Sequence, residues 1–176
     1  MKPIALFLSF LFSLPALGAD MPAFSVTSTS YKDGAEIPQK FTCQGGDANP
    51  QLAWSNLPAN TKSIAIIVDD PDAPDPAKPE RTWVHWVVYD IAPTTTSIPE
   101  SKGEAPPYSR VGKNDFGKTT WGGPCPPTGK HRYFHKVYAL DVMLGDLKEP
   151  TKAQLEAAMK GHILAQAQLV ATYQKK

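Results

Sequence analysis

The sequence predicts a mainly β protein in which stiff turns connect many short strands. Three runs rich in β-branched and aromatic residues, 63–69, 81–91 and 133–140, have the composition of strands. The 18 prolines are about twice the ordinary share and are spread over loops rather than gathered in one tract. Only the segment 151–173 has the apolar spacing of an amphipathic helix. We therefore expect a β-rich domain with a helix near its C-terminal end.

The first 19 residues resemble a secretory signal peptide. Lys2 precedes an apolar run at 4–14, and small residues follow that run. The run is shorter than the roughly 20 residues that span a bilayer. We expect cleavage after Ala19, with cleavage after Gly18 as the alternative. The protein would then be exported, to the periplasm of a Gram-negative cell or otherwise to the medium. The other interpretation of this run is an apolar N-terminal strand.

The expected mature chain, 20–176, has a balanced charge and the length of a single domain. Without Lys2, 17 basic residues face 17 acidic ones. Such a chain lacks the basic surface that supplies most of the affinity for nucleic acid, and it has no basic run suited to anionic lipid. No segment after the leader is apolar enough to predict a transmembrane helix. A homodimer is left open.

Cys43 and Cys125 are the two cysteines, and an oxidising compartment favours a disulfide between them. Closing such a long loop is worth about 4–5 kcal/mol in the chain-entropy model. Two free buried thiols are the alternative. The cysteines lack the C-x-x-C spacing of a zinc site.

The N-terminal half of the mature chain reads as strands separated by polar turns. The segment 24–30 alternates apolar and polar residues at its start and is predicted to be the first strand. Asp33-Gly34 indicates a turn, and Phe41 is a candidate start for a second strand. A Gly/Asp/Asn-rich loop follows at 43–50. The continuous apolar run 63–69 predicts a strand in the interior of a sheet with both faces covered.

The second half contains two further strands and two long loops. The residues 69–76 are acidic and proline-rich and are predicted to form a loop. The segment 94–118 is polar and is expected to be mostly irregular, which in a compact domain indicates function or unrecognised structure. In the strand 81–91, period-two alternation predicts two faces. One would carry Trp83, His85, Val87 and Tyr89, and the other Val84, Trp86 and Val88.

The segment 151–173 is predicted to be a helix that packs on the β-core. Thr151 followed by Gln154 fits a capping box. Apolar residues recur at intervals of three, four and seven positions: Leu155, Met159, Ile163, Val170 and Tyr173. His162, beside Gly161, is expected to pack or cap within this helix.

The segment 121–133, W-G-G-P-C-P-P-T-G-K-H-R-Y, is the strongest candidate for a ligand site. Its prolines limit the backbone states that the loop loses on folding, and Gly123 has no Cβ to keep a small ligand from the backbone. His131 and Tyr133 would share one face of the strand that follows. The segment thus predicts one wall of an anion pocket. A rigid hairpin loop with ordinary strand residues is the alternative.

Acidic and histidine residues lie beside the ends of three predicted strands. Asp70 and Asp72 follow the first, His85 lies in the second, and His131 lies at the third. A carboxylate near an imidazole fixes its tautomer and favours the imidazolium. A charged histidine with backbone N–H groups would suit phosphate, sulfate or carboxylate. Alternatively, Asp70 and Asp72 cap their own turn.

The sequence supports other chemistries less well. His85, His131 and His135 with an aspartate have the residue types of a two-His-one-carboxylate metal site, but no pair has helical H-x-x-x-H spacing. The chain contains no G-x-S-x-G, P-loop or G-x-G-x-x-G motif. A disulfide would also silence a Cys125–His131 pair. We expect a protein without a metal, a cofactor or enzymatic activity. A hydrolase that uses the His/Asp cluster is the third hypothesis.

Three motifs resemble the signatures of the phosphatidylethanolamine-binding protein family, which includes the Raf kinase inhibitor proteins. They are D-P-D-A-P from Asp70, W-V-H-W from Trp83 and G-P-C-P-P-T-G-K-H-R-Y from Gly123. N-D-F-G at Asn114 and G-H-I-L-A-Q-A at 161–167, taken as helical, are similar to the bacterial branch. The resemblance covers nearly the whole expected mature chain. It implies a Greek-key β-sandwich of two antiparallel sheets, with a C-terminal helix beside a small anion pocket.

By this resemblance the ligand site combines residues of all three motifs: Asp70, Asp72, Pro74, His85, Gly123, His131 and Tyr133. Trp121 stands where the family usually has tyrosine, so the hydroxyl of that position is missing. The loop cysteine is common in the bacterial branch, which supports pairing of Cys43 with Cys125.

The leading functional hypothesis is an exported, non-enzymatic protein that binds a phosphate-type or phospholipid headgroup. Protonated His85 or His131 would supply positive charge, and the loop backbone would supply donors. The alternative is a protein-directed inhibitor or modulator, of a serine protease or a signalling partner, that uses the pocket rim or 94–118. Eukaryotic members of the family restrain kinases or serine proteases, but export would separate this chain from cytosolic ATP.

Overall fold

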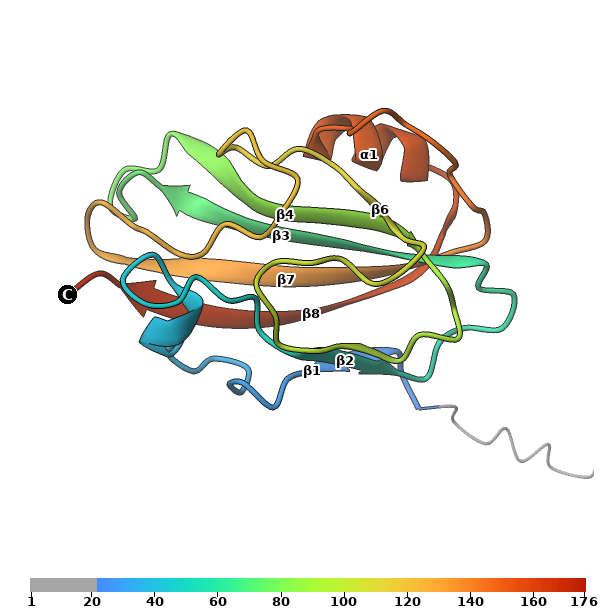
Figure 1. Cartoon of the computed structure of the whole chain (residues 1–176), viewed down its shortest axis with the longest axis horizontal. Helices are drawn as coiled ribbons and strands as arrows, with labels where there is room; N and C mark the ends of the chain where they lie inside the picture. Colours follow the sequence, from blue (N-terminus) through green and yellow to red (C-terminus); the bar gives the residue numbers. More distant parts are fainter. Residues whose placement is uncertain (1–21) are drawn as a thin grey trace, which may run out of the picture.

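In the computed structural model, which describes residues 22–176, the chain forms two antiparallel sheets and a short α-helix (Figure 1). The larger sheet has the strand order β6-β4-β3-β7-β8 and the smaller has the order β1-β2-β5. Figure 1 shows α1 over one side of the larger sheet and β1 and β2 on the other side. The elements are β1 (Ser25–Thr27), the 3-10 helix η1 (Gln39–Phe41), β2 (Leu52–Ser55), β3 (Ser63–Ala73), β4 (Arg81–Ile91), β5 (Ser97–Ile98), β6 (Arg110–Val111), β7 (Lys130–Leu140), α1 (Lys152–Met159) and β8 (Ile163–Gln174).

The main core cluster draws residues from both sheets. Leu52 and Trp54 of β2 pack with Ile66 of β3, Trp86 of β4 and Val137 of β7. A second cluster lies on the helix side of the larger sheet. The mainly β class with two antiparallel sheets is therefore confirmed, whereas the Greek-key connectivity stays a prediction. The expected leader 1–19 lies outside the described residues.

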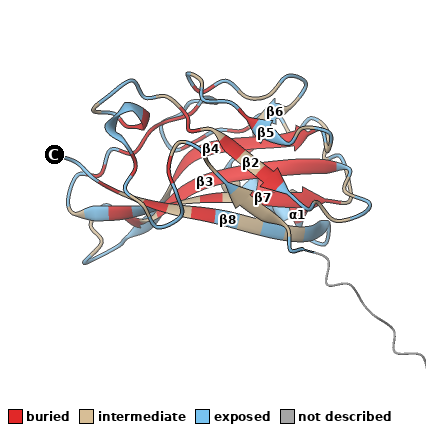
Figure 2. Ribbon diagram, turned by 90° about the horizontal axis from the view of Figure 1, so that it is seen from below, coloured by how far each residue is buried: buried red, intermediate tan, exposed pale blue. Residues whose placement is uncertain are grey.

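Strand β3 occupies the centre of the larger sheet, as its apolar sequence predicted. It pairs with β4 on one side and β7 on the other, and residues 63–70 are all buried (Figure 2). The predicted loop 69–76 is wrong at its start, because β3 continues to Ala73. The buried aspartates of this end have basic partners on the neighbouring strand β7, which offsets the cost of burying their charge.

The alternation predicted for β4 is interrupted at His85. The register of β3 with β4 shifts there, because Val84 and Trp86 pair with adjacent residues of β3 and leave His85 without a partner. Val84 consequently packs with Val87 and Tyr89 beneath the helix, while Trp86 packs between the sheets. The predicted faces are therefore confirmed from Trp86 to Tyr89, and the prediction is wrong for Val84, which shares the face of Val87 and Tyr89. The irregularity is a β-bulge, a feature that re-aims a side chain.

The predicted helix 151–173 is wrong beyond its first two turns. The capping box of Thr151 and Gln154 is present, but α1 ends at Met159 and Gly161 adopts a left-handed φ of 85°. The chain then forms β8, the edge strand of the larger sheet. Its buried residues recur at every second position: Leu169, Ala171 and Tyr173. The apolar residues of this segment are also spaced as in a helix, so the two-residue period of a strand was not recognised in the sequence.

Other local predictions had mixed outcomes. The first strand is present but short, at Ser25–Thr27, and Phe41 ends a 3-10 helix rather than beginning a strand. The turn at Asp33-Gly34 is present, and Gly34 donates its N–H to the carbonyl of Val170 on β8. The excursion 94–118 is mostly irregular but contains β5 and β6. Within residues 22–176 no helix is long and apolar enough to cross a membrane.

Candidate functional site

A cavity of about 260 Å³ lies where β3, β4 and β7 meet the loops at 116 and 125–127. Five of the seven predicted site residues line it: Asp70, Pro74, His85, His131 and Tyr133. Most of its remaining wall is aromatic or proline, with one cation and the half-cystine of the disulfide: Ala73, Arg81, Trp83, Phe116, Cys125, Pro126 and Pro127. The three motifs therefore converge on one small, largely apolar hollow.

Asp70 and His131 form a buried pair at the cavity wall. The Nδ1 atom of His131 lies 2.7 Å from Oδ2 of Asp70. Its Nε2 lies 2.9 Å from the carbonyl of Thr128 and must donate to it, since a carbonyl only accepts. Burial raises the pKa of Asp70, although hydrogen bonds from His131 and the Asp72 N–H oppose this. Both nitrogens of His131 are thus occupied and neither is free for a ligand.

His85 presents its other ring nitrogen without a partner. Its Nδ1 donates to the carbonyl of Gly122 at 2.6 Å. Its Nε2 is buried and has no hydrogen-bond partner within the described part of the chain. Burial lowers the pKa of His85 to about 4, and the hydrogen bond to Gly122 only partly opposes this. At neutral pH the ring is therefore uncharged, contrary to the expectation that His85 supplies positive charge.

Tyr133 adds a second polar atom without a partner. Its ring packs edge-to-face on His85 with centroids 5.2 Å apart, and its hydroxyl is buried and unpaired among residues 22–176. Burial raises the pKa of this hydroxyl, so it remains a hydrogen-bond donor. Two residues of the cavity wall thus carry a buried polar atom without a partner in residues 22–176, the Tyr133 hydroxyl and Nε2 of His85.

Asp72 does not line the cavity. It forms a two-point ion pair with Arg132, with Oδ1 2.7 Å from Nη2 and Oδ2 2.9 Å from Nε, and Oδ2 also accepts the Arg132 N–H. These bonds hold the pKa of Asp72 below its usual range. Asp72 therefore holds the start of β7 in position beside the cavity.

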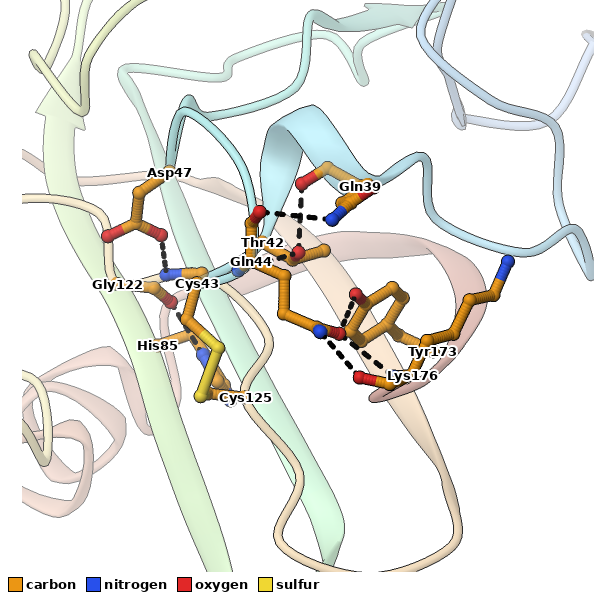
Figure 3. The surroundings of a disulfide bond; sticks show 11 residues. Gln39, Thr42, Cys43, Gln44, Asp47, His85, Gly122, Cys125, Tyr173 and Lys176 are labelled. Atoms are coloured by element: carbon orange, nitrogen blue, oxygen red, sulfur yellow. Dashed lines mark hydrogen bonds between the residues drawn. A yellow bond between two sulfur atoms is a disulfide. The ribbon is translucent and has the colours of Figure 1, made fainter.

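Gly123 does not line the cavity and lies two residues before Cys125, whose disulfide with Cys43 is drawn in Figure 3. Its N–H donates to Oδ1 of Asp47 at 2.7 Å. A Cβ at this position would meet Asp47 and the backbone of Phe41, not a ligand. Gly123 therefore allows the loop to pack against the 43–50 segment. Because Cys125 lines the cavity, the disulfide ties the cavity wall to that segment.

Sequence reasoning missed the cation of the site, Arg81. Its guanidinium lies 4.3 Å from the centre of the Trp83 ring. It forms no ion pair with any residue of 22–176. The two-residue spacing of Arg81 and Trp83 on a strand was a usable signal. Phe116, which contacts Trp83 and His85 edge-to-face, belongs to the N-D-F-G motif, but that motif was not assigned to the site because it lies in an irregular loop.

Trp121 occupies the position at which the family that the motifs resemble usually has tyrosine. It lies outside the cavity lining. It is buried, stacks on His135 and meets Trp86 edge-to-face. His135 in turn contacts the hydroxyl of Tyr31 through Nε2 at 2.8 Å. His135 therefore belongs to the packing between the sheets. In residues 22–176 no three His, Cys, Asp or Glu residues are grouped to hold a metal ion.

Comparison with known proteins gives consistent matches over nearly the whole chain. A family model described as phosphatidylethanolamine-binding protein matches residues 27–174. A UPF0098 protein of Chlamydia trachomatis is 41% identical over 150 residues, which cover 85% of this chain and 98% of that protein. A UPF0098 protein of Aquifex aeolicus is 44% identical over 163 residues, covering 90% and 91% respectively.

Solved structures match the fold over a similar share of the chain. A phosphatidylethanolamine-binding protein homolog from Chlamydia trachomatis superposes with a TM-score of 0.80 at 40% identity, covering 88% of this chain and 99% of that one. Escherichia coli YbcL gives 0.78 at 33% identity, covering 87% and 99%. A carboxypeptidase Y inhibitor gives 0.57 at 15% identity, covering 88% and 85%, a likeness of fold alone.

Proposed function

The chain belongs to the phosphatidylethanolamine-binding protein family, and we propose that it is a non-enzymatic binding protein whose cavity holds a small oxyanion. The phosphate of a headgroup is the expected ligand. One observation carries the proposal: the cavity combines a guanidinium that has no ion-pair partner in residues 22–176 with buried polar atoms that lack hydrogen-bond partners. Arg81 is exposed and free to bind an oxyanion, whereas the buried polar atoms of the cavity wall are costly to leave unsatisfied.

The positive charge is assigned to Arg81 rather than to the histidines. His85 is neutral at pH 7, and His131 faces the carboxyl of Asp70, so this pair has no net charge when it holds one proton between Oδ2 and Nδ1. A guanidinium presents several donors to an oxyanion and stays charged at every relevant pH. The aromatic and proline walls would contact the apolar part of the ligand.

Titration of phosphoethanolamine and of inorganic phosphate by calorimetry tests this assignment. We expect Arg81→Ala to weaken binding by about ten-fold or more, the loss of roughly 1.4 kcal/mol of a charge-assisted hydrogen bond. Lys113→Ala is a suitable control, because Lys113 is exposed and within residues 22–176 its side chain forms an ion pair only with Glu149, at 3.5 Å. Equal affinity in the wild type and Arg81→Ala would refute the role of Arg81. Turnover of a chromogenic phosphoester would contradict the non-enzymatic part.

We also propose that the protein works outside the cytosol, in the periplasm or the medium. The disulfide supports this, since it joins two exposed cysteines that a reducing cytosol would keep as thiols. Cell fractionation and N-terminal sequencing provide the test. We expect a non-cytosolic protein that starts at Asp20, and a cytosolic protein with a free thiol at Cys43 would contradict export.

A protein-directed inhibitor or modulator is the second candidate, favoured by one exposed aromatic side chain. Tyr108, in the excursion 94–118, is 99% exposed and has a left-handed φ of 62°. Exposed aromatic residues are enriched where proteins bind each other. If this candidate is right, a panel of serine proteases and carboxypeptidases will include one that the wild type inhibits and Tyr108→Ala does not.

A further inference from the structure

We propose that the protein forms a symmetric dimer through the free edge of β8, in which residues 163–168 of two copies pair as antiparallel strands. This surface is separate from the cavity, none of whose lining residues lies on β8. The inference follows from backbone groups at this edge that have no partner within one chain. It goes beyond the proposed function, and neither depends on the other.

One half of the β8 edge is covered and the other half is open. Near the end of the strand, the segment 33–37 forms hydrogen bonds with the N–H and C=O groups of Val170 and Thr172. Because outward-pointing groups recur at every second residue of a strand, those of Gln166 and Gln168 point outward as well. They have no hydrogen-bond partner among residues 22–176, and both residues are exposed (Figure 2).

This edge lacks the features that usually prevent sheet edges from pairing. Soluble proteins keep their edge strands short or place charged residues and proline on them. Residues 163–174 contain no charged residue and no proline, and their register with β7 is regular from Ala165 onward. The opposite edge strand of the sheet, β6, is by contrast only two residues long. The open half of β8 is therefore suited to pairing with another strand.

A second copy of β8 is complementary to this edge. When a strand pairs with itself in antiparallel orientation, the contact is isologous, so the same outward groups are satisfied in both copies. No like charges meet, because the strand is uncharged. The pairing would also cover Ile163 and Leu164, whose side chains are 44% and 40% exposed in the single chain.

The covered half of the edge fixes the register of the pair. With Gln166 opposite Gln166 of the second copy, the pair uses the open stretch from Leu164 to Gln168. A shift of the pair toward the end of the strand places Leu164 against Val170, whose backbone groups are already bonded to 33–34. A shift the other way moves Gln168 past the start of the second strand. A glutamine amide both donates and accepts, so the two Gln166 side chains at the axis can bond each other.

The face of the sheet beside this edge has room for the side chains of a second copy. A hollow of about 490 Å³ lies there, lined by Lys136, Tyr138, Gln166, Ala167 and Gln168. Directly opposite residues of an antiparallel pair lie on the same face. In the proposed register Leu164 of the second copy therefore lies beside Gln168, at the rim of this hollow.

Cysteine cross-linking tests the register. Opposite residues of a hydrogen-bonded antiparallel pair have Cα atoms about 5.5 Å apart, which suits a disulfide. Gln166→Cys should therefore form a covalent dimer under mild oxidation. Gln168→Cys is the matched control, because the two copies of this residue are offset by roughly 13 Å along the strands. Alone it should not cross-link, whereas a mixture with Leu164→Cys should.

A charge at the axis tests the dimer in solution. Gln166→Lys places two ammonium groups opposite each other, so the Kd of the dimer should rise about ten-fold or more. Mixing this variant with Gln166→Glu should restore a mixed dimer. Gln174→Lys is the control, since it makes the same change on the same strand beyond the open stretch. Sedimentation velocity over a concentration series measures the Kd, and thermal unfolding establishes that each variant is folded.

Hydrogen exchange gives a measurement on the wild type. The amides of Gln166 and Gln168 should exchange more slowly as the protein concentration rises, because dimerisation pairs them. The amides of Ala165 and Ala167 face β7 and should exchange slowly at every concentration.

Three outcomes would overturn the inference. The first is a wild type that stays monomeric at about 0.1 mM. The second is a dimer whose Kd is unchanged in Gln166→Lys, which would lie at another surface. The third is a Gln166→Cys protein that, purified from its own compartment, is cross-linked to a different polypeptide, which would then be the occupant of the edge. Each of these leaves oxyanion binding at the cavity unaffected.

Discussion

His85 and His135 lie on neighbouring parts of the core, and burial gives both the same acid–base behaviour. Each is buried, and burial lowers the pKa of each to about 4. An unfolded histidine titrates near 6.5, so the folded state resists the proton that the unfolded state accepts. This difference makes the stability of the protein depend on pH in the mildly acidic range.

We expect the free energy of unfolding to be greatest above pH 6.5 and to fall between pH 6.5 and pH 4. In that window the unfolded state binds protons at His85 and His135 while the folded state does not, which costs up to about 1.4 kcal/mol per pH unit for each residue. Asp70 acts in the opposite direction at lower pH, because its pKa is raised in the folded state. Urea unfolding at half-unit pH steps measures the slope.

A pair of variants identifies the contribution of His135. His135→Phe keeps the stacking on Trp121 and should lower the slope by about one proton. Tyr31→Phe removes the partner of Nε2, which lies 2.8 Å away, but titrates nothing in this range, so it should change stability without changing the slope. An unchanged slope in His135→Phe would show that other groups cause the pH dependence.

At the level of elements, Gly161 separates α1 from β8. Its φ of 85° is strained for any residue with a Cβ, yet an added Cβ would meet no atom within 4 Å. Gly161→Ala should therefore destabilise the protein by about 1 kcal/mol through backbone strain alone. Gly46→Ala is the matched control, because Gly46 has no left-handed φ and its Cβ would make only an ordinary contact. Chemical denaturation compares the two, and equal stabilities would contradict the argument.

The disulfide joins two loops that the sequence separates by 82 residues. Replacing both cysteines by serine should cost up to about 4.5 kcal/mol in the chain-entropy model. Since Cys125 and Pro126 line the cavity, the double variant should also bind phosphoethanolamine less tightly at temperatures where it remains folded. Denaturation and calorimetry on the same sample test both statements. Loss of stability with unchanged affinity would show that the disulfide stabilises the fold but does not shape the cavity.

For the molecule as a whole, the sequence predicted which side chains come together at the site more accurately than it predicted the strands and helices that carry them. The motifs around Asp70, His85 and His131 were recognisable because each lies beside a strongly apolar strand. Tertiary pairing decided the rest. The bulge at His85 depends on the register with β3, and β8 forms because β7 offers an edge to a segment whose apolar spacing also suits a helix. Neither partner is visible in the local sequence.

Asp69 joins the helix to the sheet and carries the last prediction. Its carboxylate is 1% exposed, and Oδ2 lies 2.8 Å from Nζ of Lys136 on β7 and 2.6 Å from Nζ of Lys152 on α1. Because two lysines share one buried charge, either alone should keep it compensated. Lys136→Met or Lys152→Met should therefore cost about 1 kcal/mol or less, since methionine preserves much of the apolar stem packing.

The double variant should behave differently from the sum of the two. With both ammonium groups gone, Asp69 is a buried charge without compensation, and the loss should reach about 3–5 kcal/mol. Its Oδ1 already has no partner within the described chain, so no second bond offsets this loss. Adding Asp69→Asn should recover part of the stability by removing the charge. A double-mutant cycle from urea unfolding gives the coupling energy, and strict additivity would mean that each lysine acts on Asp69 independently.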